Sequence, residues 1–566
     1  MAPEPVSPKK MPFDKYVPFR PLPLALPDRR WPSQVIERAP LWCSVDLRDG
    51  NQALIEPMGL ARKLKLWHEL IRMGFKEIEV GFPSASQPDF DFVRAIIEEG
   101  MVPDDVTIQV LTQAREDLIA RSYESLRGAK RAIMHLYNST STVQRERVFE
   151  LPRDGVRRIA EQGATWVREY AAKQPETEWW FEYSPESFTG TELDYAAEVV
   201  NGVIGVWRPH EGQHVIINLP ATVEMSTPNV YADMIEWMHD HMAHREKIRL
   251  SLHTHNDRGC GVAAAELGVL AGADRIEGTL LGNGERTGNM DLVTMAMNLY
   301  SQGIDPELDL SDMRRIIETV EYCTEIETHP RHAYAGELVY TAFSGSHQDA
   351  IRKSLAKQRA DEPWQVAYLP IDPADLGRRY EEVIRINSQS GKGGVLHVLE
   401  RDFGITLPRW LQIAFSKVVQ GEAERTGNEV DGARVRELFD AAYVVAPQDF
   451  ALGDYQVQRV GDRVHVDASV SGKSVRGDGN GVVDAFMQAM ASTHGVRAVV
   501  EAFDEFALGQ GAAASAMACV RLGLGQTAVI GAAFAEDTTG AALQAVLNAL
   551  GRARALSPAG LSPAAE

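Results

Sequence analysis

The sequence has few cysteines and no long apolar run. Its four cysteines, Cys43, Cys260, Cys323 and Cys519, lie far apart and include no C-x-x-C pair, which argues against a disulfide framework and against a thiolate zinc site. No apolar run has the length of a membrane helix, and no basic segment followed by an apolar one marks a secretory leader. We therefore expect a cytoplasmic protein that has no membrane partner.

Positive charge is also scarce. The 566 residues include 58 lysines and arginines against 79 aspartates and glutamates, which gives a formal net charge of −21. This balance argues against general binding to nucleic acid, although it does not argue against the binding of small anions at a local site. With 44% hydrophobic and 24% charged residues, the chain has the composition of a globular protein. Its length predicts about three or four domains.

Proline is concentrated at the start of the chain. Residues 1–40 hold 10 of the 29 prolines, so they are predicted to form an extended arm rather than a helix or a core strand. Two interpretations remain open: the arm is disordered, or it lies across a neighbouring subunit.

Between residues 41 and 311, short apolar runs alternate with segments of helical spacing. Eight runs are typical of β-strands, at residues 41–46, 77–82, 106–111, 130–137, 179–183, 214–219, 247–253 and 274–281. Helical spacing occurs between them, for example at residues 59–73, 154–171 and 229–241. Eight strand–helix units over this length predict a (β/α)8 TIM barrel. A doubly wound open sheet is the alternative, but no G-x-G-x-x-G motif follows the first run.

The rest of the chain loses this alternation. Residues 312–437 are predicted to form a mostly helical connector that carries a few functional loops. Residues 438–566 predict an α+β domain, with strands at 455–460, 463–470, 496–508, 515–522 and 527–535 and helices at 481–490 and 538–550. The order of strands and then a helix occurs twice, so we expect an approximate internal repeat.

Two histidines close the seventh predicted strand. His253 and His255 are two residues apart, so both imidazoles point from one face of an extended strand. Asp49 follows the first strand and Asn289 follows the eighth, and these two strands are neighbours in a closed barrel. The four side chains predict a site for Mg²⁺, Mn²⁺ or Zn²⁺ with room for a bidentate 2-oxo acid. The alternative is a pair of hydrogen-bonded histidines without a metal.

Arg48 directly precedes the predicted acidic ligand. A fixed guanidinium beside a carbonyl group stabilises the alkoxide that forms when the carbonyl carbon is attacked. The alternative role for Arg48 is an ion pair with Glu79 or Glu285 at the rim of the barrel.

Three motifs carry a resemblance to a known family: DLRDGNQ at residues 46–52, HTHND at residues 253–257 and GNGERTGN at residues 282–289. They resemble the motifs of the 2-isopropylmalate synthase family, which belongs to the metal-dependent enzymes that condense an acyl-CoA with a 2-oxo acid. The resemblance implies condensation of acetyl-CoA with 3-methyl-2-oxobutanoate and thioester hydrolysis to 2-isopropylmalate and CoA, the first committed step of leucine synthesis. It also implies a homodimer in which Asp49, His253 and His255 hold the metal, with Asn289 close by.

The resemblance implies two candidates for the base that takes a proton from acetyl-CoA. One is Glu186, which follows the fifth predicted strand, and the other is His347, assisted by Tyr368. It further implies that His347 and Tyr368 reach the site from the partner subunit. Without the resemblance, a lone histidine in a connector is more often structural.

The oxo-acid pocket is also implied by the resemblance. Its predicted residues are Leu111, Tyr137, Ser184, Asn218, Pro220, Thr222, Glu285 and Gly288. The strand-end residues are apolar on one side and carry hydroxyls on the other, which suits an isopropyl group, and none supplies a cation for a second carboxylate. Pyruvate, the substrate of citramalate synthase, is an alternative because one small apolar group changes binding by only ~1–3 kcal/mol. A further alternative is a catalytically silent barrel that senses an amino acid.

The C-terminal module resembles the leucine-binding regulatory domain of the family. Gly479, Asn480 and Gly481 lead into a predicted helix, so their backbone N–H groups are candidates to receive the carboxylate of leucine. The family usually has proline after Asn-Gly, whereas this chain has Val482, a departure that bears on effector affinity. The alternative is a dimerisation module whose pocket is not used.

Overall fold

The computed structural model describes residues 28–342, 344–378, 398–400, 402–426, 430–445, 450–496, 498–508, 515–525 and 527–556. The described residues form two compact units, one from those within 1–339 and 373–378 and the other from those within 340–372 and 379–566. Within the described residues, no helix has both the length and the apolar character needed to cross a membrane. Most of the predicted arm, residues 1–27, lies outside the described residues.

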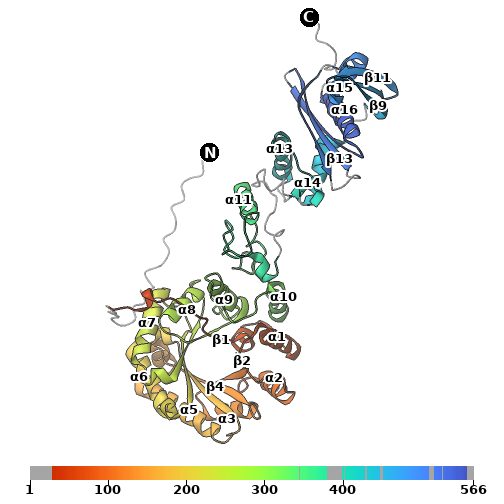
Figure 1. Cartoon of the computed structure of the whole chain (residues 1–566). Coiled ribbons are helices and arrows are strands. Elements are labelled where there is room, and N and C mark those ends of the chain that lie inside the picture. The colour runs from red at the N-terminus through yellow and green to blue at the C-terminus, as the bar shows by residue number, and fades with distance from the viewer. Residues whose placement is uncertain are drawn as a thin grey trace, which may run out of the picture. The chain divides into compact units, whose positions relative to one another are not determined.

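The first unit contains a barrel of parallel strands (Figure 1). The barrel has eight strands and is closed by the pairing of β8 with β1. The strands are β1 (Leu41–Ser44), β2 (Glu77–Gly81), β3 (Thr107–Gln113), β4 (Arg131–Ser139), β5 (Glu178–Glu186), β6 (His214–Ala221), β7 (Ile248–Thr254) and β8 (Arg275–Gly278). Each strand coincides with one of the eight predicted apolar runs. The predicted TIM barrel is therefore confirmed.

Helices surround the strands of the barrel (Figure 1). They are α1 (Leu60–Met73), α2 (Gln87–Glu98), α3 (Glu116–Ser125), α4 (Thr142–Gln144), α5 (Arg153–Ala171), α6 (Leu193–Trp207), α7 (Pro228–His241), α8 (Gly261–Leu270) and α9 (Leu292–Tyr300), followed by α10 (Met313–Thr324). Their amphipathic sequences explain the arrangement: in α5, the buried residues Val156, Ala160, Ala164 and Val167 recur every three or four positions. That face packs against the neighbouring elements of the barrel and leaves the charged face to solvent.

The residues just before the barrel are tied to α7. Arg29 donates two hydrogen bonds to the carboxylate of Asp233, at 2.6 and 2.7 Å. The backbone N–H of Trp31 donates to the carboxylate of Glu236 at 2.8 Å. This part of the predicted arm therefore lies on its own barrel, which neither interpretation of the sequence included.

The barrel interior is highly polar. Arg275 is fully buried and donates to Glu77 at 2.6 Å, to Glu277 at 2.9 Å and to Gln109 at 2.7 Å. Buried charges of this kind are tolerated only when they are paired and hydrogen-bonded. Glu277 in turn accepts a hydrogen bond from His253, so the network extends to the predicted metal ligands.

The second unit begins with helices and ends with two sheets. Its helices include α11 (Gly345–Leu355), α13 (Arg409–Thr426) and α14 (Gly432–Phe439). One antiparallel sheet contains β9 (Leu452–Val460), β10 (Arg463–Val470) and β11 (Lys473–Gly479) and is followed by α15 (Val482–His494). The other contains β12 (Val499–Leu508), β13 (Ser515–Leu524) and β14 (Thr527–Ala535) and is followed by α16 (Thr538–Leu556). The predicted repeat of strands and then a helix is confirmed.

One strand of the repeat, β11, was not predicted. Val475 is its only large apolar residue, so its sequence lacks the alternation of a typical strand. Its glycines allow close packing instead: a Cβ atom on Gly477 would lie 2.2 Å from the backbone oxygen of Ala485. Gly531 has the same relation to Ala545, also at 2.2 Å. In both halves of the repeat the helix therefore packs directly against the strand backbone.

Candidate active site

Asp49 lies in a π-helical turn, Asp46–Gly50, just after β1. The carboxylate of Asp46 accepts the backbone N–H of Leu280 at 3.0 Å and the hydroxyl of Ser44 at 2.8 Å. Burial raises the pKa of Asp46 to about 7. These bonds tie the turn after β1 to the loop after β8 and so position Asp49 at the mouth of the barrel.

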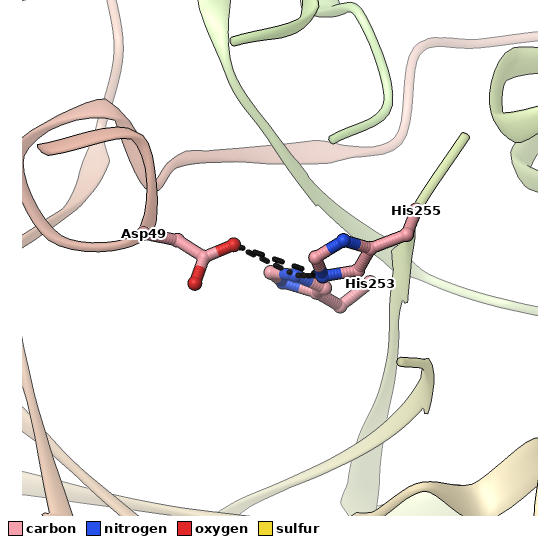
Figure 2. Close-up of side chains that lie close together, drawn as sticks. All are labelled: Asp49, His253 and His255. Carbon is pink, nitrogen blue, oxygen red and sulfur yellow. Dashed lines mark hydrogen bonds and ion pairs between the residues drawn. The ribbon is translucent and has the colours of Figure 1, made fainter. Parts of the chain in front are cut away.

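The side chains of Asp49, His253 and His255 converge on one point (Figure 2). The two imidazole Nε2 atoms are 3.2 Å apart. Oδ2 of Asp49 lies 3.5 Å from Nε2 of His253 and 3.8 Å from Nε2 of His255. Two imidazoles and one carboxylate that face the same point are a donor set suited to a divalent cation.

Unpaired polar atoms at this point support the same conclusion. Oδ2 of Asp49 and Oδ1 of Asn289 are buried and accept no hydrogen bond, although Oδ2 lies within ion-pair distance of the two histidines. Asn289 is also bridged to His255 by a backbone pairing, which brings the amide next to the imidazole. A buried acceptor without a partner is costly, and a cation bound between these atoms would remove that cost. The residues therefore fit a divalent metal ion.

Glu277 orients one of the two imidazoles. Its Oε2 lies 2.9 Å from Nδ1 of His253, and the same oxygen accepts a hydrogen bond from Nδ2 of Asn218 at 3.2 Å. A carboxylate that accepts the Nδ1–H of a histidine leaves Nε2 as the atom available for a metal, and it makes that nitrogen more basic.

The pKa values of the three convergent residues are shifted in different directions. Burial favours the neutral form of His253, but the neighbouring carboxylates of Asp49 and Glu277 raise its pKa to about 9. Burial lowers the pKa of His255 to about 4, and the neighbouring His253 adds to that shift. Burial also opposes ionisation of Asp49, but the Arg48 guanidinium holds the pKa of that carboxyl well below its usual range. One imidazole thus carries a proton that a metal must displace.

Arg48 lies between two carboxylates. Its Nη1 donates to Asp49, and its Nε donates to Glu79, which is fully buried. The ion pair with Glu79 proposed from the sequence is thus present, but it is buried inside the barrel and not at the rim. These two contacts use two of the five N–H groups of the guanidinium and hold its plane in place.

A second group of possible ligands lies deeper in the barrel. His135, Glu182 and Glu277 also bring three ligand atoms close together. Arg275 donates to Glu182 at 3.3 Å and to Glu277 at 2.9 Å, so a guanidinium already occupies this position and balances the charge. The site at the mouth is therefore the better candidate for a metal.

A cavity of about 160 Å³ opens beside the convergent residues. It is lined by Arg48, Asp49, Gln52, Phe82, Leu111, His135, Tyr137, Ser184, Glu186, Asn218, Pro220, Thr222, His253, His255, Glu285 and Arg286. Most of the predicted site residues are thus brought together in one place. Asn289 and Gly288 lie next to the cavity without lining it, and Gly288 has a turn conformation, with φ of 96°.

The sequence analysis missed several residues of this site. His135 and Phe82 line the cavity, and Glu277 holds a predicted ligand. His135 lies two residues before Tyr137 on β4, so strand alternation would have placed it on the same face. Arg286 also lines the cavity; it donates to Asp257 and to the backbone oxygen of Thr222, both at 2.6 Å, which joins three loops at the mouth.

Two predicted catalytic residues lie in the second unit. The rings of His347 and Tyr368 stack with centroids 4.0 Å apart and planes at 28°. Both side chains are exposed, and Tyr368 is 61% accessible to solvent. The pair is therefore available for contact with another surface.

The predicted regulatory residues lie between β11 and α15. Gly479 ends the strand, and Gly481 is the N-cap residue of the helix. The backbone N–H of Asn480 donates to the carboxylate of Asp484 at 2.9 Å. The carboxylate of Asp484 thus already accepts the hydrogen bond of one of the backbone N–H groups that were predicted to bind leucine.

Curated proteins resemble the chain over nearly its whole length. The 2-isopropylmalate synthase of Alcanivorax borkumensis is 60% identical over 531 residues, which cover 93% of this chain and 95% of the relative. Those of Pseudomonas savastanoi and Ralstonia nicotianae are 55% and 53% identical, and the matches cover 93% and 96% of this chain and 95% of each relative. The chain belongs to the 2-isopropylmalate synthase family.

Family models match three successive parts of the chain. A model described as HMGL-like matches residues 39–320, and one described as alpha-isopropylmalate synthase, post-catalytic domain-like matches residues 337–400. A model of the LeuA allosteric (dimerisation) domain matches residues 429–554. The 2-isopropylmalate synthase family consists of acyltransferases of leucine biosynthesis, so the enzyme class predicted from the sequence is confirmed.

The proton on His253 predicts a pH-dependent affinity for metal. Because a metal must displace this proton, the affinity for Mn²⁺ should rise about tenfold per pH unit and level off above about 9. The raised pKa also stabilises the metal-free protein, fully below pH 6.5, and this contribution is lost as the pH rises to about 9. Titration calorimetry in two buffers of different ionisation enthalpy measures both the affinity and the proton release. An affinity that does not change over this range would contradict the assignment.

Proposed function

We propose that this chain condenses acetyl-CoA with 3-methyl-2-oxobutanoate and hydrolyses the thioester to give (2S)-2-isopropylmalate and CoA. The observation that carries the proposal is the convergence of Asp49, His253 and His255 beside a cavity lined by Arg48. Relatives that are named 2-isopropylmalate synthase and match over most of the chain support the same reaction.

The metal ligands in this proposal are Asp49, His253 and His255, with Asn289 close by. The expected ion is Mg²⁺, with Mn²⁺ and Zn²⁺ as alternatives, because the donor set mixes oxygen and imidazole nitrogen. When it is bound, the ion supplies Lewis acidity that polarises the ketone of the oxo acid. The unpaired oxygen atoms of Asp49 and Asn289 support this ligand set.

Arg48 is proposed to stabilise the oxygen that becomes negative when the ketone is attacked. Its guanidinium lines the cavity and is already fixed by Asp49 and Glu79. A donor that does not have to reorganise during the reaction lowers the barrier most effectively. Replacement of Arg48 by lysine would keep the charge but lose the planar arrangement of donors.

Two candidates remain for the base that removes a proton from the methyl group of acetyl-CoA. Glu186 is supported by its place on the cavity wall, where its carboxylate accepts the hydroxyl proton of Ser139. His347, assisted by Tyr368, is supported by the exposed stacked pair and acts in this proposal from the partner subunit of a homodimer. In either case the carboxylate oxygen or the imidazole nitrogen receives the proton.

The shape of the cavity supports an oxo acid with a small apolar side chain. Leu111, Tyr137 and Pro220 contribute apolar surface. The hydroxyl of Thr222 accepts the backbone N–H of Ser187 at 2.9 Å, which leaves the hydroxyl proton free to bind a carboxylate oxygen of the substrate. Glu285 also lines the cavity, and Gly288 shapes the adjacent turn.

We further propose that leucine regulates the enzyme through residues 438–566, after the barrel (residues 41–311) and the connector (residues 312–437). The match to the LeuA allosteric domain supports this role. The backbone of Gly479, Asn480 and Gly481 would receive the carboxylate of leucine. Because Asp484 occupies the N–H of Asn480, an effector carboxylate would have to replace it there.

Release of CoA from acetyl-CoA tests the reaction. With Mg²⁺ present, 3-methyl-2-oxobutanoate should give the highest kcat/KM among 3-methyl-2-oxobutanoate, pyruvate and 2-oxoglutarate, and leucine should reduce the rate. The preference over pyruvate should be about 10-fold or more, since two additional methyl groups are buried. A clear preference for pyruvate would replace this proposal with citramalate synthase, and no CoA release with any oxo acid would favour an amino-acid sensor.

Exchange of subunits tests the shared site. Arg48→Ala and His347→Ala should each be inactive as homodimers. Random mixing should yield heterodimers with one intact site and recover about a quarter of the wild-type activity. Mixing Arg48→Ala with His253→Ala is the matched control, because each barrel of the heterodimer then carries one lesion, so that neither site is intact and no activity should return. Failure of the first pair to recover activity would contradict a contribution of His347 from the partner.

A further inference from the structure

A chain of hydrogen bonds leads from the wall of the cavity into the barrel. His135 on β4 is 3% exposed; its Nδ1 lies 2.8 Å from Oε1 of Glu79 and its Nε2 lies 2.7 Å from Oγ of Ser184. Both His135 and Ser184 line the cavity, whereas Glu79 is fully buried. Ser184, His135 and Glu79 thus form a continuous chain of hydrogen bonds that leads from the cavity wall to the barrel interior.

The direction of these hydrogen bonds follows from Glu79. Burial opposes its ionisation, but the Arg48 guanidinium and His135 keep the pKa of Glu79 below its usual value. Gln109 donates a further hydrogen bond to the same carboxylate at 3.0 Å. An ionised carboxylate can only accept, so Nδ1 of His135 carries the proton. When Nδ1 carries the single ring proton, Nε2 is an acceptor, and the hydroxyl of Ser184 donates to it.

The second contact of Ser184 has a fixed direction as well. Nδ2 of Asn218 lies 3.0 Å from Oγ of Ser184 and 3.2 Å from Oε2 of Glu277. The amide nitrogen of Asn218, and not its oxygen, faces both of these oxygen atoms, so the amide donates in each contact. Ser184 therefore donates its one proton to His135 and accepts one from Asn218. One lone pair of the Ser184 Oγ atom is then left, and it is available to a group bound in the cavity.

We propose that His135 is a positioning residue that determines specificity: by accepting the Ser184 hydroxyl proton, it leaves only an acceptor facing the substrate. A substrate side chain made of methyl groups makes no hydrogen bonds with water, so it loses none when it is buried against this surface. A side chain with a carboxylate or another acceptor meets a lone pair and cannot form the hydrogen bonds that it has in water. The inference rests on the proposed function, because it names how the same pocket selects among 2-oxo acids.

Two conservative replacements separate this role from a structural one. His135→Gln places an amide near the position of Nε2, where it can still accept from Ser184. His135→Asn places the amide near Nδ1, where it can still donate to Glu79 but leaves the Ser184 hydroxyl free to turn into the cavity. Each variant keeps one of the two hydrogen bonds, so they are matched controls for each other.

The measurement is the ratio of kcat/KM for 3-methyl-2-oxobutanoate to that for oxaloacetate, at a pH where imidazoles are ordinarily neutral. Oxaloacetate has a side chain of similar size that ends in a carboxylate. Wild type and His135→Gln should retain a large ratio, whereas His135→Asn should reduce it by about tenfold or more, since a donor replaces an acceptor. Addition of Ser184→Ala to His135→Asn should return the ratio to the value of Ser184→Ala alone.

Other results would overturn the inference. A merely structural role predicts that both His135 variants lower activity with both substrates equally and leave the ratio unchanged. If His135→Asn does not fold, Ser184→Ala tests the inference instead. Because this variant removes the lone pair, it should also lower the ratio of the two kcat/KM values. An unchanged ratio in Ser184→Ala would contradict the inference. The ratio of dissociation constants, from calorimetry with Mg²⁺ and without acetyl-CoA, does not require turnover. Failure of CoA release would thus count against the proposed function alone.

Discussion

The structure of the site depends on a balance of buried charge inside the barrel. Carboxylates outnumber guanidinium groups there: Asp49, Glu77, Glu79, Glu182 and Glu277 are paired with Arg48, Arg275 and, in the case of Glu77, also with Arg249. Burial raises the pKa of Glu182 well above its usual value, so that carboxyl can be neutral. A divalent cation bound where Asp49 meets the two histidines would displace the proton of His253 and add positive charge beside these carboxylates.

The same network links the parts of the site that have different tasks. Glu277 orients His253 and accepts from Asn218, whereas Glu79 holds Arg48 and accepts from His135. The proposed metal, the group that stabilises negative charge and the wall of the substrate pocket are thus coupled through two buried carboxylates. Such coupling implies that replacements at these carboxylates alter metal binding and substrate selection together, since networked polar groups are not additive.

Much of the fold and of the site was predictable, for physical reasons. Each barrel strand is an apolar run that the sequence displays, and side chains just after parallel strands meet at one end of a barrel. Glu277 was missed because a polar residue within a short apolar run shows no sign that it faces the interior, whereas His135 could have been found from strand alternation with Tyr137. β11 was missed because glycine, which its packing against α15 requires, weakens the strand pattern. The roles of His347 and Tyr368 could not follow from spacing, since they lie in a different unit.

Anomalous diffraction from crystals of the protein grown with Mn²⁺ tests the central claim most directly. The account predicts one strong peak at the mouth of the barrel, within bonding distance of Oδ2 of Asp49 and Nε2 of both His253 and His255. Oδ1 of Asn289 should lie close to the same peak. A peak elsewhere, or the two imidazoles turned away from Asp49 with no ion between them, would contradict it.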